Sequence, residues 1–275
     1  MNIFAIIAFL FSVFLAVSPA SSQAPSCTVT GSTTTFPAGD DCWGEPDFYQ
    51  IRIYEVGLCT SLPIFPTTNS TPGLSSCVTI FTSTTGSVVD VTPTTTSALS
   101  GVFTRPENGS YPYGYIRMDA SFGIQVSVDF GVAITGDAGG NGQFCASITG
   151  STANGTSATC AGVAPTAGTL QTPLTDFGGD EGFAGSDSIT STTSSGTSTI
   201  DGFLMTGADQ LATSAADVQR LFGVQTFGTP VSVTDTTTGI DISFRVTTGM
   251  TLIGNAGPTL SIDSGPFIID ITATP

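Results

Sequence analysis

Residues 124–132 read Ile124-Gln-Val126-Ser-Val128-Asp-Phe130-Gly-Val132, with an apolar side chain at every second position. Because successive side chains of a β-strand point to opposite faces, this alternation predicts a strand with one buried and one solvated face. Residues 240–246 read Ile-Asp-Ile-Ser-Phe-Arg-Val and repeat the pattern. Strands with one solvent-exposed face are typical of antiparallel sheets, so the two runs favour an antiparallel fold.

Weaker runs of the same kind occur along the chain, and turn-forming sequences separate them. The turn signals include Glu107-Asn108-Gly109 and Gly139-Gly140-Asn141-Gly142. Threonine, serine and glycine fill most polar positions, which favours strands and tight turns over long helices. The weaker candidate strands are residues 48–56, 77–82, 87–91, 111–118, 250–253, 260–263 and 267–272.

One segment carries a helical signal. Ser214-Ala-Ala-Asp217 has the spacing of a capping box, with Asp in place of Glu, and it leads into Val218, Leu221 and Phe222. Many short strands with one short helix predict an all-β, antiparallel fold of the β-sandwich or jelly-roll-like type.

The N-terminus predicts export. Residues 3–17 are almost continuously apolar, but the run is shorter than the roughly 20 residues that cross a bilayer. Ser18 and Ala20 suit the small-residue positions of a signal peptidase site, so we expect residues 1–20 to be a signal peptide. Since Met1-Asn2 carries no side-chain cation, an uncleaved membrane anchor is the alternative. No membrane span is expected after cleavage, and the mature chain is expected to be secreted, extracellular or at the cell surface, with the periplasm as an alternative.

All six cysteines follow the predicted signal peptide, and they form three pairs of neighbours along the sequence. An even cysteine number in an exported chain predicts disulfides that stabilise the fold. Pairing of sequential neighbours closes the shortest loops, and a zinc site would need close Cys-x-x-Cys pairs or histidine, which the sequence lacks. We therefore expect the bridges Cys27–Cys42, Cys59–Cys77 and Cys145–Cys160.

The chain is acidic, with 21 Asp and Glu against five arginines, no lysine, no histidine and a formal net charge of −16. Such a surface repels nucleic acid and anionic lipid, which excludes nucleic-acid partners. Without imidazole or amine side chains, Ser–His–Asp triads, Schiff bases and most zinc centres are unavailable. No catalytic or cofactor-binding residue stands out, and we expect a protein that is not an enzyme.

The composition shifts near Asp137, where glycine, serine and threonine become dense and remain so to about Thr199. This stretch is typical of a linker or of long surface loops. We therefore expect a β-sandwich unit over residues 21–135, followed over residues 136–275 by a second β-unit or by an extension of the same sandwich.

Four carboxylates gather within residues 176–187. Ca²⁺ binds six to eight oxygen ligands, which such a loop can offer, although the spacing is not that of an EF-hand. A solvated acidic loop is the alternative. The candidate calcium ligands are Asp176, Asp180, Glu181 and Asp187.

Tyr111, Tyr113 and Tyr115 are spaced to share one face of a strand, where aromatic rings could bind a glycan or pack against another layer. Edge strands can also pair between subunits, and residues 265–271 and 27–36 are candidates to exchange or close such an edge.

Three function classes fit these observations. The first is a secreted, non-catalytic structural protein of the cell surface or of an extracellular filament. The second is an extracellular ligand-binding or adhesive β-sandwich module that recognises a glycan or Ca²⁺. The third is a carboxylate-pair hydrolase such as a glycosidase, whose acid and nucleophile would be two of the aspartates or glutamates. We expect the first.

Overall fold

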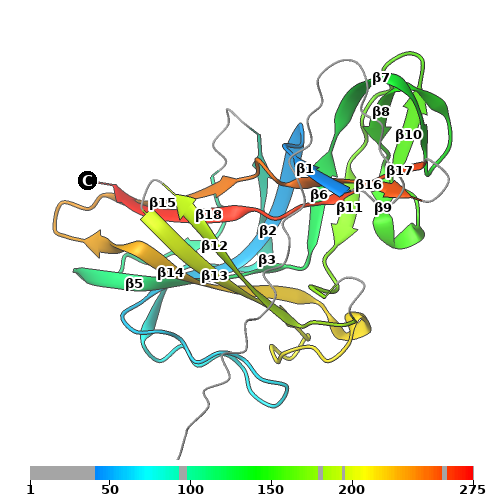
Figure 1. Cartoon of the computed structure of the whole chain (residues 1–275). Helices are drawn as coiled ribbons and strands as arrows, with labels where there is room; N and C mark the ends of the chain where they lie inside the picture. The colour runs from blue at the N-terminus through cyan, green and yellow to red at the C-terminus, as the bar shows by residue number, and fades with distance from the viewer. Residues whose placement is uncertain (1–40, 93–97, 179–181, 194–195, 256–258, 275) are drawn as a thin grey trace, which may run out of the picture.

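The computed structural model of the chain describes residues 41–92, 98–178, 182–193, 196–255 and 259–274 (Figure 1). The expected signal peptide and the segment 27–36 lie outside these ranges. Within them the chain forms strands throughout, with short 3-10 turns, which confirms the all-β prediction. Strand pairs are antiparallel except for β9–β11 and β7–β17.

The larger of the two main sheets has ten strands. Eight of them follow the order β12-β13-β14-β5-β2-β6-β11-β9, while β3 pairs with β2 and β4 pairs with β3. Their bounds are β2 Phe48–Cys59, β3 Cys77–Val91, β4 Val102–Phe103, β5 Gly109–Asp119, β6 Ser121–Gln125, β9 Gly150–Ser151, β11 Leu170–Pro173, β12 Ser186–Thr193, β13 Gly196–Met205 and β14 Arg220–Val233.

The smaller main sheet has six strands in the order β1-β16-β17-β7-β8-β10. A further two-stranded sheet pairs β15 with β18, and in Figure 1 this pair lies over the larger sheet, at the end away from β7, β8 and β10. The bounds are β1 Asp41–Gly44, β7 Ser127–Gly136, β8 Asn141–Ser147, β10 Ala158–Ala161, β15 Gly239–Arg245, β16 Met250–Asn255, β17 Thr259–Ser264 and β18 Ile268–Thr274.

The run at residues 124–132 spans both main sheets. Its first residues end β6 of the larger sheet, and its last residues lie in β7 of the smaller one. Between them the Val126 N–H donates to Ser147 Oγ at 3.0 Å, and the Ser147 N–H donates to the Val126 carbonyl at 2.9 Å. Val128 and Phe130 are buried and Asp129 is exposed, as the alternation predicts.

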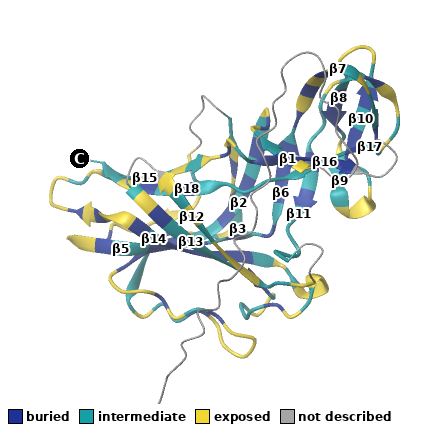
Figure 2. Cartoon of the chain, in the orientation of Figure 1, coloured by how far each residue is buried: buried dark blue, intermediate teal, exposed yellow. Residues whose placement is uncertain are grey.

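One main hydrophobic core joins the layers into a sandwich-like body. Ile51 and Ile124 of the larger sheet, Leu252 and Ile262 of the smaller sheet, and Ile269 of β18 all belong to it. Figure 2 shows the buried residues along the middles of the strands and the exposed ones at loops and strand ends. Full burial of one such side chain contributes about 1.5–3 kcal/mol, so this core dominates the free energy of folding.

A second, smaller cluster covers the opposite face of the larger sheet, which we call the outer face. It contains Cys59, Tyr115, Phe203, Met205, Phe222 and Val224. Leu58 and Leu221, each adjacent to a member of this cluster, belong to the main core instead. Because neighbouring strand residues point to opposite sides, the larger sheet is buried on both faces where this cluster lies.

The helix expected after Ser214 is not formed. Residues Ala215–Asp217 make a single 3-10 turn, and Leu221 and Phe222 lie in β14. Ser214 Oγ donates to the Asp217 carboxylate at 2.7 Å and makes no bond to the backbone of the turn. Leu221 and Phe222 enter the two different apolar clusters, which a strand allows and a single helix face does not.

The reading of residues 137–199 as a linker or long loops was also wrong. The polar segment Ser186–Thr193 is strand β12, paired along its length with β13. Threonine suits strands, and the hydroxyls of Thr190 and Thr199 lie 3.4 Å apart across the two strands.

The sheets mix strands from before and after residue 135. β5 pairs with β14, β1 pairs with β16, and β7 pairs with β8. The boundary at residue 135 therefore does not separate one sheet from the other. The units 21–135 and 136–275 stay a prediction about which parts of the chain fold independently.

Candidate functional site

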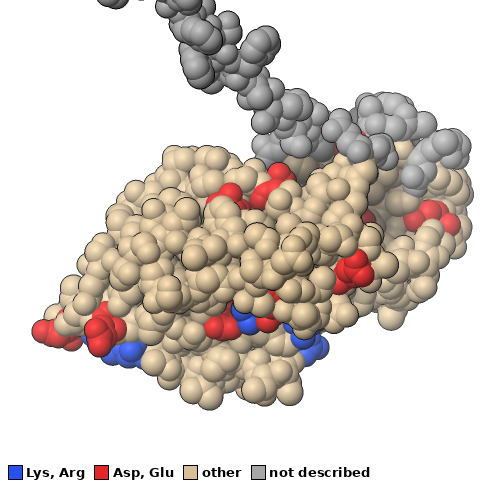
Figure 3. Space-filling view, turned by 90° about the horizontal axis from the view of Figure 1, so that it is seen from below, with Lys and Arg blue, Asp and Glu red and all other residues tan. Residues whose placement is uncertain are grey.

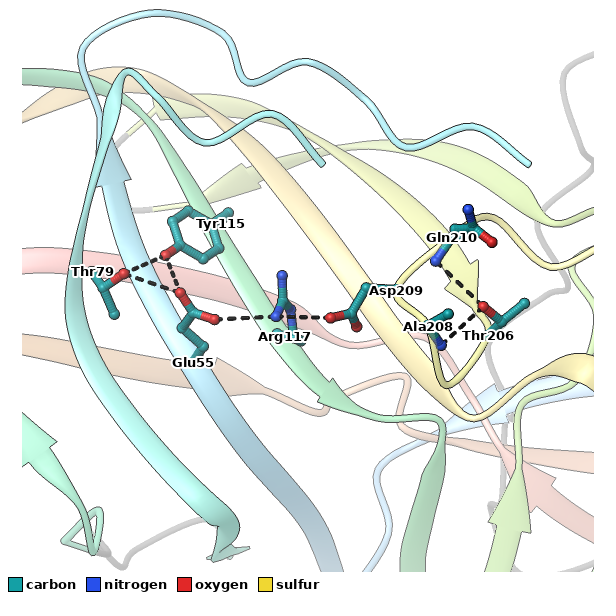
Figure 4. A network of polar contacts seen from close by, with 8 residues as sticks. All are labelled: Glu55, Thr79, Tyr115, Arg117, Thr206, Ala208, Asp209 and Gln210. Carbon is teal, nitrogen blue, oxygen red and sulfur yellow. Dashed lines mark hydrogen bonds and ion pairs between the residues drawn. The ribbon is translucent and has the colours of Figure 1, made fainter. Parts of the chain in front are cut away.

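A polar network crosses the outer face of the larger sheet beside the smaller apolar cluster (Figure 4). Glu55 Oε1 accepts hydrogen bonds from Tyr115 Oη at 2.6 Å and from Thr79 Oγ1 at 3.0 Å. Its other oxygen lies 3.4 Å from a terminal nitrogen of Arg117. The same nitrogen lies 3.2 Å from the carboxylate of Asp209, so one guanidinium joins two acidic groups.

A β-bulge places Glu55 in this network. The register of β2 against both β3 and β5 shifts between Ile53 and Glu55. Ile53 and Val56 are fully buried in the main core, whereas the two residues between them, Tyr54 and Glu55, are only partly buried. A bulge inserts one extra residue into a strand, so both side chains can point outward. Alternation alone would have turned Glu55 into the core.

Asp209 is aimed at Arg117 by a tight turn. Its φ of 57° lies in the left-handed region, which Asp tolerates better than most residues. Thr206 closes this turn, because its hydroxyl accepts from the N–H groups of Ala208 and Gln210. The Leu211 N–H donates to the Thr67 carbonyl at 3.0 Å, so the turn is also tied to the loop at residues 60–76.

Burial raises the pKa of the Tyr115 hydroxyl, and its hydrogen bond to Glu55 raises that pKa further. Tyr115 therefore stays a neutral donor to Glu55 at physiological pH. Hydrogen-bonded networks of this kind hold their members in one geometry. Chemically, the arrangement ties the 206–210 turn to the sheet through Asp209 and Arg117, and the Leu211–Thr67 bond links that turn to the 60–76 loop.

Two of the predicted disulfides are confirmed. Cys59 and Cys77 join adjacent strands β2 and β3 and close the 60–76 loop, while Cys145 and Cys160 join β8 and β10. The third predicted bridge involves Cys27, which lies outside the described residues.

The predicted calcium loop is described only in part, because Asp180 and Glu181 lie outside the described ranges. Asp176 accepts backbone N–H bonds from Ala184 at 2.6 Å and from Gly178 at 2.8 Å, and these bonds lower its pKa. Asp187 accepts from the N–H of Ser188 at 2.8 Å. Asp176 thus ties the two ends of the loop together, and the calcium site stays a prediction.

The three tyrosines do not form one exposed row. Tyr111 packs in the main core, and its hydroxyl donates to the Glu107 carbonyl at 2.8 Å. Tyr115 belongs to the outer cluster, and Tyr113 packs against that cluster. The register of β14 against β5 shifts opposite residues 111–113, so the pairing there is not that of a regular ladder.

Of the Glu55 network, the sequence drew attention only to Tyr115, as one of three spaced tyrosines, and not to Glu55, Arg117 or Asp209. The available signal was the interrupted alternation at Tyr54-Glu55, where two polar positions follow one another within an otherwise alternating strand.

Comparison with protein-family models, with curated protein sequences and with solved structures finds no match to this chain. In the described ranges, no helix is long and apolar enough to cross a membrane. The two disulfides are consistent with an oxidising extracellular or periplasmic location. The fold and the network together define a sandwich-like all-β protein stabilised by disulfides.

Proposed function

We propose that this chain is an exported, non-catalytic structural protein of the cell surface or of an extracellular filament, and that it assembles by pairing of strand edges between copies. The proposal rests on the exposure of strand β4, which pairs with β3 on one side. Its residues Val102 and Phe103 are 64% and 63% exposed. An exposed apolar edge strand is a template for another strand, and natural monomers usually protect such edges.

A second copy of the same chain is the proposed partner. Two identical edges can pair antiparallel about a two-fold axis, which gives a closed, self-complementary contact. Phe103 already packs on Phe81 at a ring-centroid distance of 5.2 Å, so the edge is fixed in position before assembly. Further contacts at the other end of the molecule would extend such a pair into a filament.

The Glu55 network supports a structural role over catalysis by a carboxylate pair. A glycosidase needs its two carboxyl groups to face the sugar from opposite sides with room for substrate or water. Here Arg117 lies between Glu55 and Asp209 and bonds to both. The two carboxylates therefore share one guanidinium, and this contact ties the turn that carries Asp209 to the sheet.

Negative-stain microscopy and mass determination of the purified mature protein test the proposal. We expect ordered assemblies from the wild type and dissociated protein from Val102→Asp combined with Phe103→Asp. The matched control is Val163→Asp, because Val163 is 80% exposed but belongs to no strand. A monodisperse wild-type monomer, or assembly that survives the β4 substitutions, would contradict the proposal.

A further inference from the structure

A polar hollow of about 240 Å³ lies where β2, β6 and β11 run side by side. At its centre Gly123 of β6 pairs with Gln50 of β2 on one side and with Gln171 of β11 on the other. Phe122 and Ile124, the neighbours of Gly123, belong to the main core, so this position faces outward. The hollow therefore lies on the outer face of the larger sheet.

Gly123 forms the floor of the hollow because it lacks a side chain. A Cβ at this position would lie 3.0 Å from Gln171 Nε2 and 3.1 Å from Gln50 Cβ, so even one methyl group would crowd both glutamines. The backbone of Gly123 has no positive φ, and the glycine is therefore not required by a turn. Its effect on the molecule is to let the Gln50 and Gln171 side chains approach each other over its Cα.

Charged groups in the wall of the hollow are already paired. Arg52 Nε lies 3.8 Å from Asp119 Oδ2, and Tyr54 Oη donates to the same carboxylate oxygen at 3.4 Å. Arg220 stacks over the Tyr54 ring, with 4.1 Å from its guanidinium carbon to the ring centroid. This chain of contacts holds the Asp119 carboxylate in position and leaves the hollow with almost no net charge.

The side chains around the hollow suit hydroxyl groups. The Gln171 amide and the Ser121 hydroxyl offer donors and acceptors, as sugar hydroxyls do. Gln50, whose Nε2 already donates to Asp90 Oδ1 at 2.9 Å, adds its amide oxygen and its second N–H. Val88, which is 41% exposed, adds an apolar contact for the C–H groups of a sugar ring. The volume is below the 300–1,000 Å³ of sites for drug-sized ligands, so the hollow suits a single small ring.

Anionic ligands fit less well. The arginine in the wall is paired with a carboxylate, and the chain carries a formal net charge of −16. Figure 3 shows the same balance on one face of the molecule, where arginines lie beside acidic groups and most of the surface is uncharged. A phosphate or carboxylate would find the arginine of the hollow already paired and would be repelled by the net negative charge of the chain as a whole.

We propose that this hollow binds one neutral sugar ring of a glycan, with Gln50 and Gln171 holding its hydroxyl groups above Gly123. This proposal is independent of the β4 assembly, because the hollow and β4 share no residue. A surface protein with both features would attach to a glycan as well as to its own copies.

The test uses the full mature chain labelled with ¹⁵N. The side-chain amide signals of Gln50 and Gln171 are followed by NMR during titration with glucose, galactose, mannose and N-acetylglucosamine separately, and with inorganic phosphate. We expect saturable shifts of both amides with at least one sugar and none with phosphate. Absence of a saturable shift with all four sugars, or equal shifts with phosphate, overturns the proposal.

Two variants test the geometry. Gly123→Ala fills the floor and Gln171→Ala removes one amide, and each should weaken binding of the responding sugar at least tenfold. Gln125→Ala is the matched control, because Gln125 lies two residues further along β6 and bonds to Thr169 outside the hollow. If Gly123→Ala does not fold, Gln171→Ala decides the question, and unchanged affinity in a folded variant contradicts the assignment.

Discussion

Gln225 on β14 is only 5% exposed, yet neither atom of its side-chain amide has a hydrogen-bond partner among the described residues. Its strand neighbours are Ile200 on β13 and Gly114 on β5, which offer no polar side chain. A buried amide without partners costs about 1–3 kcal/mol of stability. Gln225 is thus a weak point within an otherwise apolar part of the sheet.

Replacing this amide should stabilise the protein. We expect Gln225→Met, which keeps length and approximate volume, to raise the free energy of unfolding by about 1–3 kcal/mol in urea denaturation. The same change at half-buried Gln143 of β8 is the control and should stay within about 0.5 kcal/mol of the wild type. A loss of stability in Gln225→Met would show that the amide is bonded in solution.

Two buried tyrosines make stability sensitive to high pH. Burial raises the pKa of Tyr49, and the charge of Asp263 raises it further; the pKa of Tyr115 is also raised, mainly by burial. A group whose pKa is raised in the folded state contributes fully below its unfolded pKa, about 10 for tyrosine, and loses that contribution as pH rises above it.

We therefore expect the free energy of unfolding, measured at a series of pH values, to fall above about pH 10. Tyr49→Phe should make this fall shallower without loss of packing, because the Tyr49 hydroxyl has no hydrogen-bond partner in the described structure. An alkaline profile identical to that of the wild type would contradict the assignment to Tyr49.

At the scale of single elements, β18 shows how one face of a strand holds the sandwich together. Ile269 and Ile271 are 5% and 3% exposed and belong to the main core, while Ile268 and Asp270 are only partly buried. The strand closes against β15 within the same molecule. This is the alternation that the sequence of residues 267–272 predicts.

Neighbouring isoleucines in β18 provide a matched pair of variants. Ile269→Ala should cost about 2–5 kcal/mol, because it leaves a cavity in the core. Ile268→Ala, on the other face, should cost clearly less. Thermal unfolding of both variants checks this order, and equal losses would show that β18 does not pack as described.

The loop at residues 176–187 gives a prediction about metal. If its carboxylates bind Ca²⁺, the melting temperature should rise with added Ca²⁺ and fall on chelation, by an amount equivalent to about 2.7 kcal/mol at a hundredfold excess over the dissociation constant. Asp180→Asn combined with Asp187→Asn should abolish the response, whereas Asp241→Asn on β15 should not. Identical melting curves with Ca²⁺ and with chelator would contradict the calcium site and support the alternative, a solvated acidic loop.

At the scale of the whole molecule, each main sheet has a disulfide between adjacent strands within the described residues. Cys59–Cys77 fastens the larger sheet, and Cys145–Cys160 fastens the smaller one. Removal of a native disulfide typically costs 2–5 kcal/mol. Because one core joins the sheets, the loss of either bridge is expected to destabilise the whole body.

Cys145→Ala with Cys160→Ala should therefore lower the midpoint of a single cooperative transition, with Cys59→Ala and Cys77→Ala acting in the same way. Near-ultraviolet circular dichroism and tryptophan fluorescence, which report on different parts of the chain, should give coincident curves. Separate transitions in either variant would instead support two independent β-units divided near residue 135.

The charged residues of the candidate site were not predicted from the sequence. None of Glu55, Arg117 and Asp209 was identified, because their proximity depends on a bulge in β2 and on a turn far along the chain. The hollow at Gly123 likewise joins residues of three strands. Local patterns do not contain such register information, since pairing between distant strands sets it.

The sequence by itself determined the all-β class, the alternation at residues 124–132 and 240–246, and the two disulfides between sequential cysteines. These features follow from side-chain period and short loop closure, which are local properties. Only the tertiary structure decided that the first of these runs divides at Val126 between two sheets and that Ser186–Thr193 is a strand. Those outcomes depend on which distant strands satisfy the backbone hydrogen bonds of each segment.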